Sequence, residues 1–89
     1  MTVIDTVTNS NRRSGGHGES IRVGRIVATP VMETLWRVCN ESGSVLGHVH
    51  AVERVDGERF AAHLILPGGV RTLFLGEFWR LRDAVETFH

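Results

Sequence analysis

Alternating apolar and polar positions through the second half of the chain predict a run of short strands. This region is rich in Val, Leu, Ile and Phe, and alternation with period two is typical of a strand with one buried face. Four strands are expected, over residues 34–40, 45–52, 59–66 and 70–75. Turn-forming residues separate the later strands, namely Asp56-Gly57, a strong hairpin signal, and Pro67-Gly68-Gly69. The pattern therefore predicts an antiparallel meander.

The two ends of the chain carry different patterns. Apolar residues Leu81, Ala84, Val85 and Phe88 recur at helical spacing and predict a helix over residues 81–88. Residues 21–28 contain β-forming side chains and predict an edge strand, although the glycine within them weakens this prediction. Residues 1–20 are rich in Asn, Ser, Arg and Gly and predict a disordered arm.

Together these elements predict one small α+β domain. We expect residues 21–89 to form an antiparallel sheet of three to four strands packed on one C-terminal helix, preceded by a flexible N-terminal arm over residues 1–20. A chain of 89 residues has room for a single, small core. Self-association would add stability to such a domain.

The period-two rule also sorts side chains between the two faces of the sheet. If the helix covers the side that carries Phe60, Ala62 and Leu64, the other side is unusually apolar and holds three histidines. The residues expected there are Leu46, His48, His50, Val52, His63, Ile65 and Phe74. An apolar patch on a small protein usually marks an interface, so we predict that these residues bind a partner protein or a second copy. The alternative is that the N-terminal segment covers this face.

The stretch from Gly57 to Phe88 resembles the AP2-type DNA-binding fold, which includes the N-terminal arm-type domain of phage integrases. The matching residues are Gly57-x-x-Phe60-Ala61-Ala62-x-Leu64, Leu75-Gly76-x-Phe78 and the pair Asp83-Ala84. They are packing residues and cover about a third of the chain. The resemblance implies three strands plus a helix and, as an alternative function, a DNA-binding accessory protein of phage or mobile-element type. Family members bind DNA with Arg and Trp on the open face, where this chain has His63, Ile65, Thr72 and Phe74.

Charge bears on that alternative. Ten acidic residues balance ten basic ones, all of them Arg, so the chain has no global field to attract nucleic acid. The candidate DNA contacts are Arg12, Arg13, Arg22, Arg25 and Arg54. An Arg-containing arm of this kind suits a minor groove or a phosphate backbone.

No motif indicates an enzyme, a cofactor or a small-molecule substrate. His48, His50 and His63 on one face are a candidate zinc set, but a zinc site needs three or four converging ligands, and surface histidines are the favoured interpretation. We therefore predict no catalytic residue, no metal and no cofactor. Trp36 is expected in the core, and Trp79 either packs under the start of the helix or anchors a partner. Neither a membrane span nor a signal peptide is evident, so a cytoplasmic location is expected.

Overall fold

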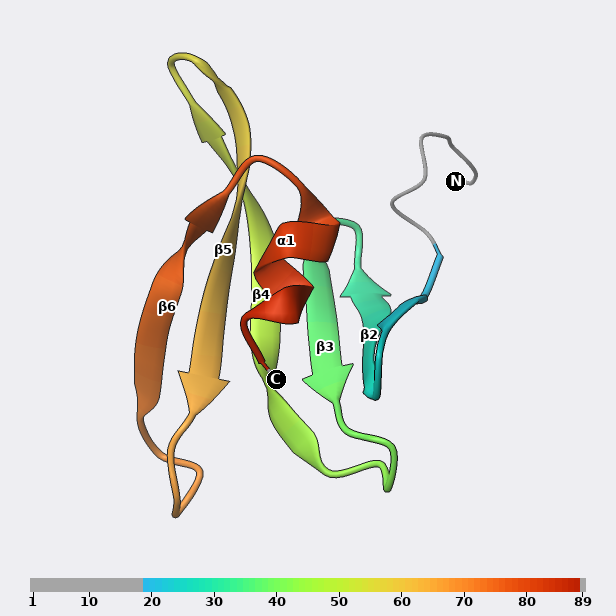
Figure 1. Cartoon of the computed structure of the whole chain (residues 1–89). Helices are drawn as coiled ribbons and strands as arrows, with labels where there is room; N and C mark the ends of the chain where they lie inside the picture. The colour runs from blue at the N-terminus through green and yellow to red at the C-terminus, as the bar shows by residue number, and fades with distance from the viewer. Residues whose placement is uncertain (1–18, 89) are drawn as a thin grey trace.

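The computed structural model describes residues 19–88, which form six antiparallel strands and one short helix (Figure 1). The elements are β1 (Ile21–Val23), β2 (Ile26–Met32), β3 (Leu35–Cys39), β4 (Val45–Arg54), β5 (Gly57–Ile65), β6 (Thr72–Phe78) and α1 (Leu81–Glu86). Each strand pairs with the next one along the chain, so the order across the sheet is β1-β2-β3-β4-β5-β6. Nearly all of the predicted arm, residues 1–20, lies outside the described residues.

The prediction of three to four strands packed on a C-terminal helix was wrong, because the protein is mostly sheet, with six strands and only a short helix. One cause is Gly24, whose φ of 61° allows a tight turn that only glycine adopts readily. The expected single strand over residues 21–28 therefore folds back on itself, and Val23 pairs with Ile26 in the β1–β2 hairpin.

A second cause lies at Pro30, which stands inside β2 although the predicted edge strand ended at residue 28. Proline has no N–H to donate and is tolerated where no strand lies alongside. The pairing between β1 and β2 ends at Ala28 of β2. Pro30 therefore has a neighbouring strand on one side only, where it lies opposite Trp36 of β3. The chain thus runs through Thr29-Pro30 as strand.

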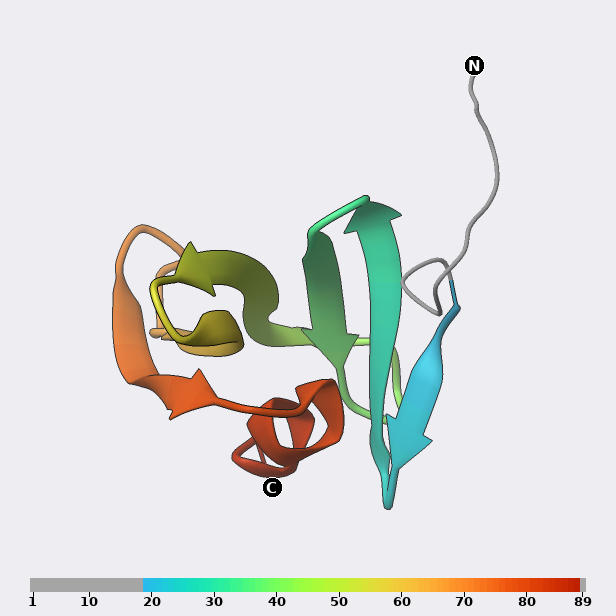
Figure 2. The same cartoon turned by 90° about the horizontal axis from the view of Figure 1, so that it is seen from above.

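The sheet curves round the helix. Seen from above in Figure 2, β6 and the β1–β2 hairpin lie on either side of α1, and α1 contacts strands at both ends of the sheet. Trp36, Val38, Val49 and Val85 are completely buried between these layers, and Trp36 meets Phe60 edge to face with ring centroids 5.9 Å apart. A helix this short is unstable alone, so packing on the sheet holds it in place. The opposite face of the sheet therefore curves outward.

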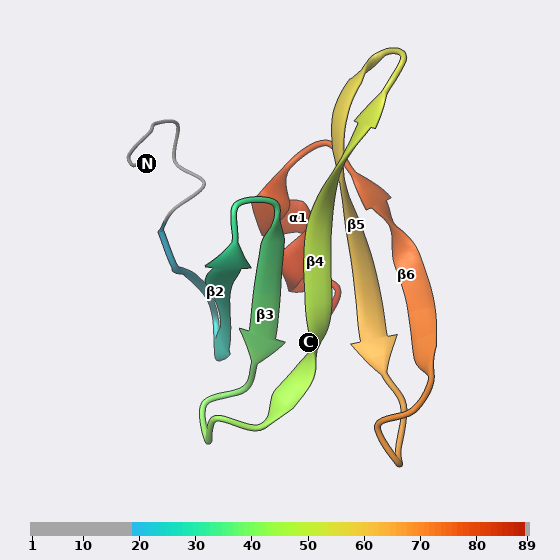
Figure 3. The same cartoon turned by 180° about the vertical axis from the view of Figure 1, so that it is seen from behind.

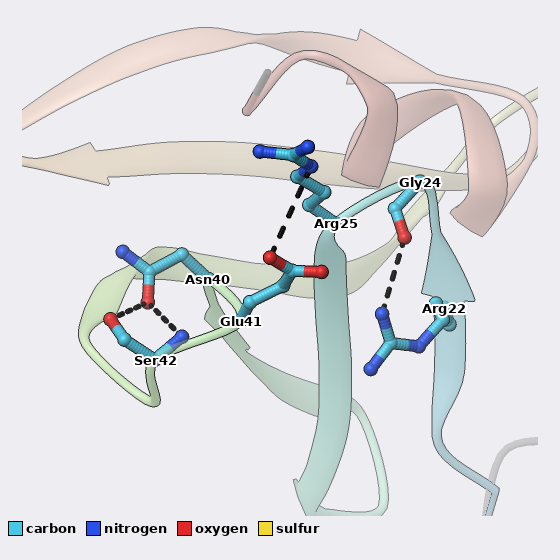
Figure 4. A network of polar contacts seen from close by, with 6 residues as sticks. All are labelled: Arg22, Gly24, Arg25, Asn40, Glu41 and Ser42. Atoms are coloured by element: carbon cyan, nitrogen blue, oxygen red, sulfur yellow. Dashed lines mark hydrogen bonds and ion pairs between the residues drawn. The ribbon is translucent and has the colours of Figure 1, made fainter.

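Two turns frame the long central hairpin of β4 and β5. In the β3–β4 turn, Oδ1 of Asn40 accepts hydrogen bonds from the backbone N–H and the Oγ of Ser42 (Figure 4). It also accepts one from the backbone N–H of Ser44. At the other end, the β4–β5 turn around Asp56-Gly57 carries the hairpin tip beyond the rest of the sheet (Figure 1). No helix among residues 19–88 is long and apolar enough to span a membrane.

Candidate functional site

Six of the seven residues predicted on the open face lie on the side of the sheet away from α1, which Figure 3 views directly. The register pairs His48 with His63 and His63 with Phe74, and Ile65 lies two residues along β5. His50 and Val52 follow His48 at alternate positions of β4. We call this surface the open face.

Leu46 lies elsewhere. The β3–β4 register shifts between Val38 and Cys39, which pair with Gly47 and Val45 and leave Leu46 as the extra residue of a bulge. A bulge interrupts the alternation of side chains between faces. Leu46 packs against the core instead.

A second bulge sets the position of Phe74. Ala62 pairs with Gly76 and His63 with Phe74, so Leu75 is the extra residue of β6. Phe74 and Phe78 are four residues apart and would share a face in a regular strand. Because of the bulge, Phe78 packs against the core while Phe74 lies on the open face with 56% of its surface exposed.

Three imidazoles gather at the centre of this face. His48 and His63 stack with their ring centroids 5.0 Å apart, and His50 lies 5.3 Å from His63 and 6.1 Å from His48. We call these three residues the histidine cluster. The Phe74 ring lies 5.4 Å from that of His63 and extends the cluster toward the free edge of the sheet.

Burial and mutual proximity favour the neutral forms of His48 and His63. Partial burial lowers the pKa of His48, and the nearby charges of His63 and His50 lower it further. Burial also lowers the pKa of His63, with a smaller contribution from His50. Since an ordinary histidine titrates near 6.5, both rings are uncharged at pH 7.

Sequence reasoning missed the charged groups that surround the cluster. Arg37 lies directly opposite His48, and it makes no ion pair with any other of residues 19–88. The sequence held a signal for Arg37: neighbouring residues of a strand point to opposite faces, so a buried Trp36 places Arg37 on the open face. Glu77 lies opposite Ala61 on the same face and is bound by Arg54 through two hydrogen bonds, so its pKa is lowered.

Trp79 is 59% exposed and does not pack under the helix. The guanidinium of Arg59 stacks 3.7 Å from the centre of its ring, a cation–π contact, and also bonds Asp56 at 2.7 Å. Arg59 is therefore compensated twice, and Arg54 is neutralised by Glu77. Within residues 19–88, Arg37 is thus the cation beside the histidine cluster that lacks an acidic partner.

The structure does not bring the candidate DNA contacts together. Arg12 and Arg13 lie outside the described residues. Arg22 donates to the carbonyl of Gly24 at 3.3 Å, and Arg25 lies 4.0 Å from Glu41, both near the β1–β2 turn (Figure 4). Arg54, by contrast, ends β4 beside the tip of the β4–β5 hairpin. The described members of this set therefore lie on separate parts of the sheet.

The arrangement offers a stacking surface and, among residues 19–88, a cation without an acidic partner, so it suits binding more than bond chemistry. In the same part of the chain, no group of three or more His, Cys, Asp or Glu side chains is arranged to hold a metal ion. Comparison with known proteins found no matching family model, no matching curated protein and no matching solved structure.

Proposed function

We propose that this protein is a small, non-enzymatic interaction module that docks a second copy of itself through the open face. The observation that carries the proposal is the row of rings formed by His48, His63 and Phe74, which is uncharged and ends in a largely exposed phenylalanine. Phenylalanine is among the aromatic side chains that are enriched in protein interfaces, and the centres of interfaces are depleted of charged residues. Val52 and Ile65 add apolar side chains to the open face on either side of this row.

Two properties favour a second copy as the occupant. The chain has zero formal net charge, so two copies do not repel each other at long range. A standard interface takes about 800 Å² from each partner, which is roughly 15% of the accessible surface of 5255 Å².

A Phe74→Asp substitution tests the docking face. It places a charge at the end of the ring row, and we expect the dimer dissociation constant to rise at least tenfold, since burying an unpaired carboxylate costs more than about 1.4 kcal/mol. Sedimentation velocity at pH 7.5 over a range of concentrations measures the effect. The matched control is Val70→Asp, because Val70 is 89% exposed in the β5–β6 turn, off the open face. A monomeric wild-type protein, or equal weakening by both variants, contradicts the proposal.

DNA binding is the second candidate, and the observation in its favour is Arg37, a cation on an outward-curved sheet with no acidic partner in residues 19–88. A curved sheet face of this kind fits the major groove, and the AP2-type resemblance implies the same use. Fluorescence anisotropy of a labelled duplex at about 50 and 200 mM salt tests it, since phosphate contacts weaken steeply over that range. This candidate predicts saturable binding that Arg37→Ala reduces, and no binding at the lower salt concentration removes it.

A further inference from the structure

We propose that the two copies pack about a two-fold axis parallel to β4 and β5, so that Arg37 of each copy lies against Phe74 of the other. This inference rests on the proposed function and specifies its geometry. It follows from the order of side chains in one row across the sheet.

The row runs through four neighbouring strands. Arg37 on β3, His48 on β4, His63 on β5 and Phe74 on β6 are successive Cα partners. Read across the strands, the chemistry is a cation followed by two imidazoles and a phenyl ring. The row therefore has unlike ends and a symmetric centre.

A two-fold axis along the strands reverses the row in the second copy. Each guanidinium then meets a phenyl ring, and each imidazole meets an imidazole, which are the contacts that these groups favour. An axis across the strands would instead lay β3 over β3 and place two Arg37 side chains against each other. Only the first arrangement is self-complementary, as the isologous contact of a two-fold dimer requires.

Charge supports the same arrangement. Arg37 has no acidic partner among residues 19–88, whereas Glu77 lies on the open face near Phe74. In the reversed row Arg37 lies beside Phe74 of the other copy and near its Glu77, a carboxylate that Arg37 would then share with Arg54. The outward curvature centres the contact on β4 and β5, so the arrangement requires the long Arg37 side chain to extend to the edge strand of the other copy.

Contact between Arg37 and Phe74 within one chain is out of reach. Three strand spacings of about 4.8 Å separate them, roughly 14 Å in all. Any coupling between the two positions is therefore a contact between copies. This makes the arrangement testable with two single substitutions.

The experiment mixes Arg37→Glu protein with Phe74→Arg protein. Alone, each variant is expected to dimerise at least tenfold more weakly than the wild type. In the Arg37→Glu homodimer, the carboxylate at position 37 meets the negative face of the Phe74 ring of the other copy. In the Phe74→Arg homodimer, the guanidinium at position 74 meets the guanidinium of Arg37 of the other copy. In the mixture, one end of the heterodimer pairs the introduced carboxylate with the introduced guanidinium, and the other end keeps the original pair of Arg37 and Phe74. We expect sedimentation of the 1:1 mixture to show a heterodimer within about threefold of wild-type affinity.

The outcomes separate this inference from the proposed function. If the wild type dimerises and Phe74→Asp abolishes the dimer, but the mixture stays monomeric, the docking face stands and the axis is wrong. If the wild type is monomeric, both fail. Circular dichroism confirms that each variant is folded, and the double variant Arg37→Glu/Phe74→Arg provides a second reading, because it is expected to recover dimerisation on its own.

Discussion

A Gly47→Ala substitution is expected to destabilise the fold by about 3 kcal/mol, the upper end of the usual cost of overpacking. Gly47 lies in β4 where the strand crosses the core, and a Cβ built there clashes with the backbone carbonyl oxygen of His63. It also lies 2.7 Å from Cε2 of Phe88 and 3.0 Å from Cα of Leu64. Two of these three neighbours are backbone atoms of β5, so relief requires parting the β4–β5 ladder.

Urea unfolding followed by circular dichroism measures this loss, because the midpoint shifts while the slope stays constant if only stability changes. Val45→Ala in the same strand is the matched control, since Val45 is 48% exposed and its truncation opens no cavity. The control is expected to stay within about 1 kcal/mol of the wild type. A Gly47→Ala midpoint as mild as that of the control would show that β5 can move aside without cost.

Part of this fold follows from the sequence, and the part that does not has identifiable causes. The alternation in residues 45–52 and 59–66 depends only on which side is buried, so the positions of His48, His50 and His63 on one face follow from period two alone. The β1–β2 hairpin does not follow from the sequence, because Gly24 fits a weak point within a single strand as well as the turn of a hairpin. Its φ of 61° becomes visible only once Val23 and Ile26 pair.

The bulges set a second limit. Residues Thr72 to Phe78 alternate plausibly as one strand, and nothing in their order marks Leu75 as the extra residue. The bulge is fixed by the pairing with β5, where Ala62 and Phe60 require Gly76 and Phe78 on the core side. The same limit applies at Leu46, which period two alone places on the open face although the bulge of β4 turns it to the core. Alternation along the sequence therefore predicts which face a side chain lies on only as far as the next β-bulge.

If the proposed dimer forms, acidification is expected to separate its two copies. The charged groups facing the histidine cluster are Arg37 on β3, Arg54 on β4, Arg59 on β5 and Glu77 on β6. Cations outnumber acids, and Glu77 is already bound by Arg54, so the face offers little to stabilise protonated imidazoles. In the proposed dimer, packing against a second cluster would remove further water and lower the pKa of His48 and His63 below its value in the single copy.

The direction of the effect follows from proton linkage. The free copy binds protons more readily than the dimer, so dissociation takes up protons and the dimer weakens as pH falls below the pKa of the free copy. Burial already lowers that pKa from 6.5, so affinity is expected to be constant between pH 7.5 and about 6.5 and to fall at lower pH. One proton per copy gives roughly a hundredfold rise in dissociation constant for each pH unit.

Sedimentation between pH 7.5 and 5.0 measures this dependence, with circular dichroism at each pH. The second measurement is needed because the same lowered pKa values also make the fold itself less stable in acid: the unfolded chain binds the protons more tightly, and stability falls below pH 6.5. The control variant His48→Gln/His50→Gln/His63→Gln keeps polar side chains at these positions but cannot titrate, and its association is expected to be flat over the range. Tighter association of the wild type in acid would contradict the stacked, uncharged interface, because protonated imidazoles would then be stabilised by an acidic surface on the other copy.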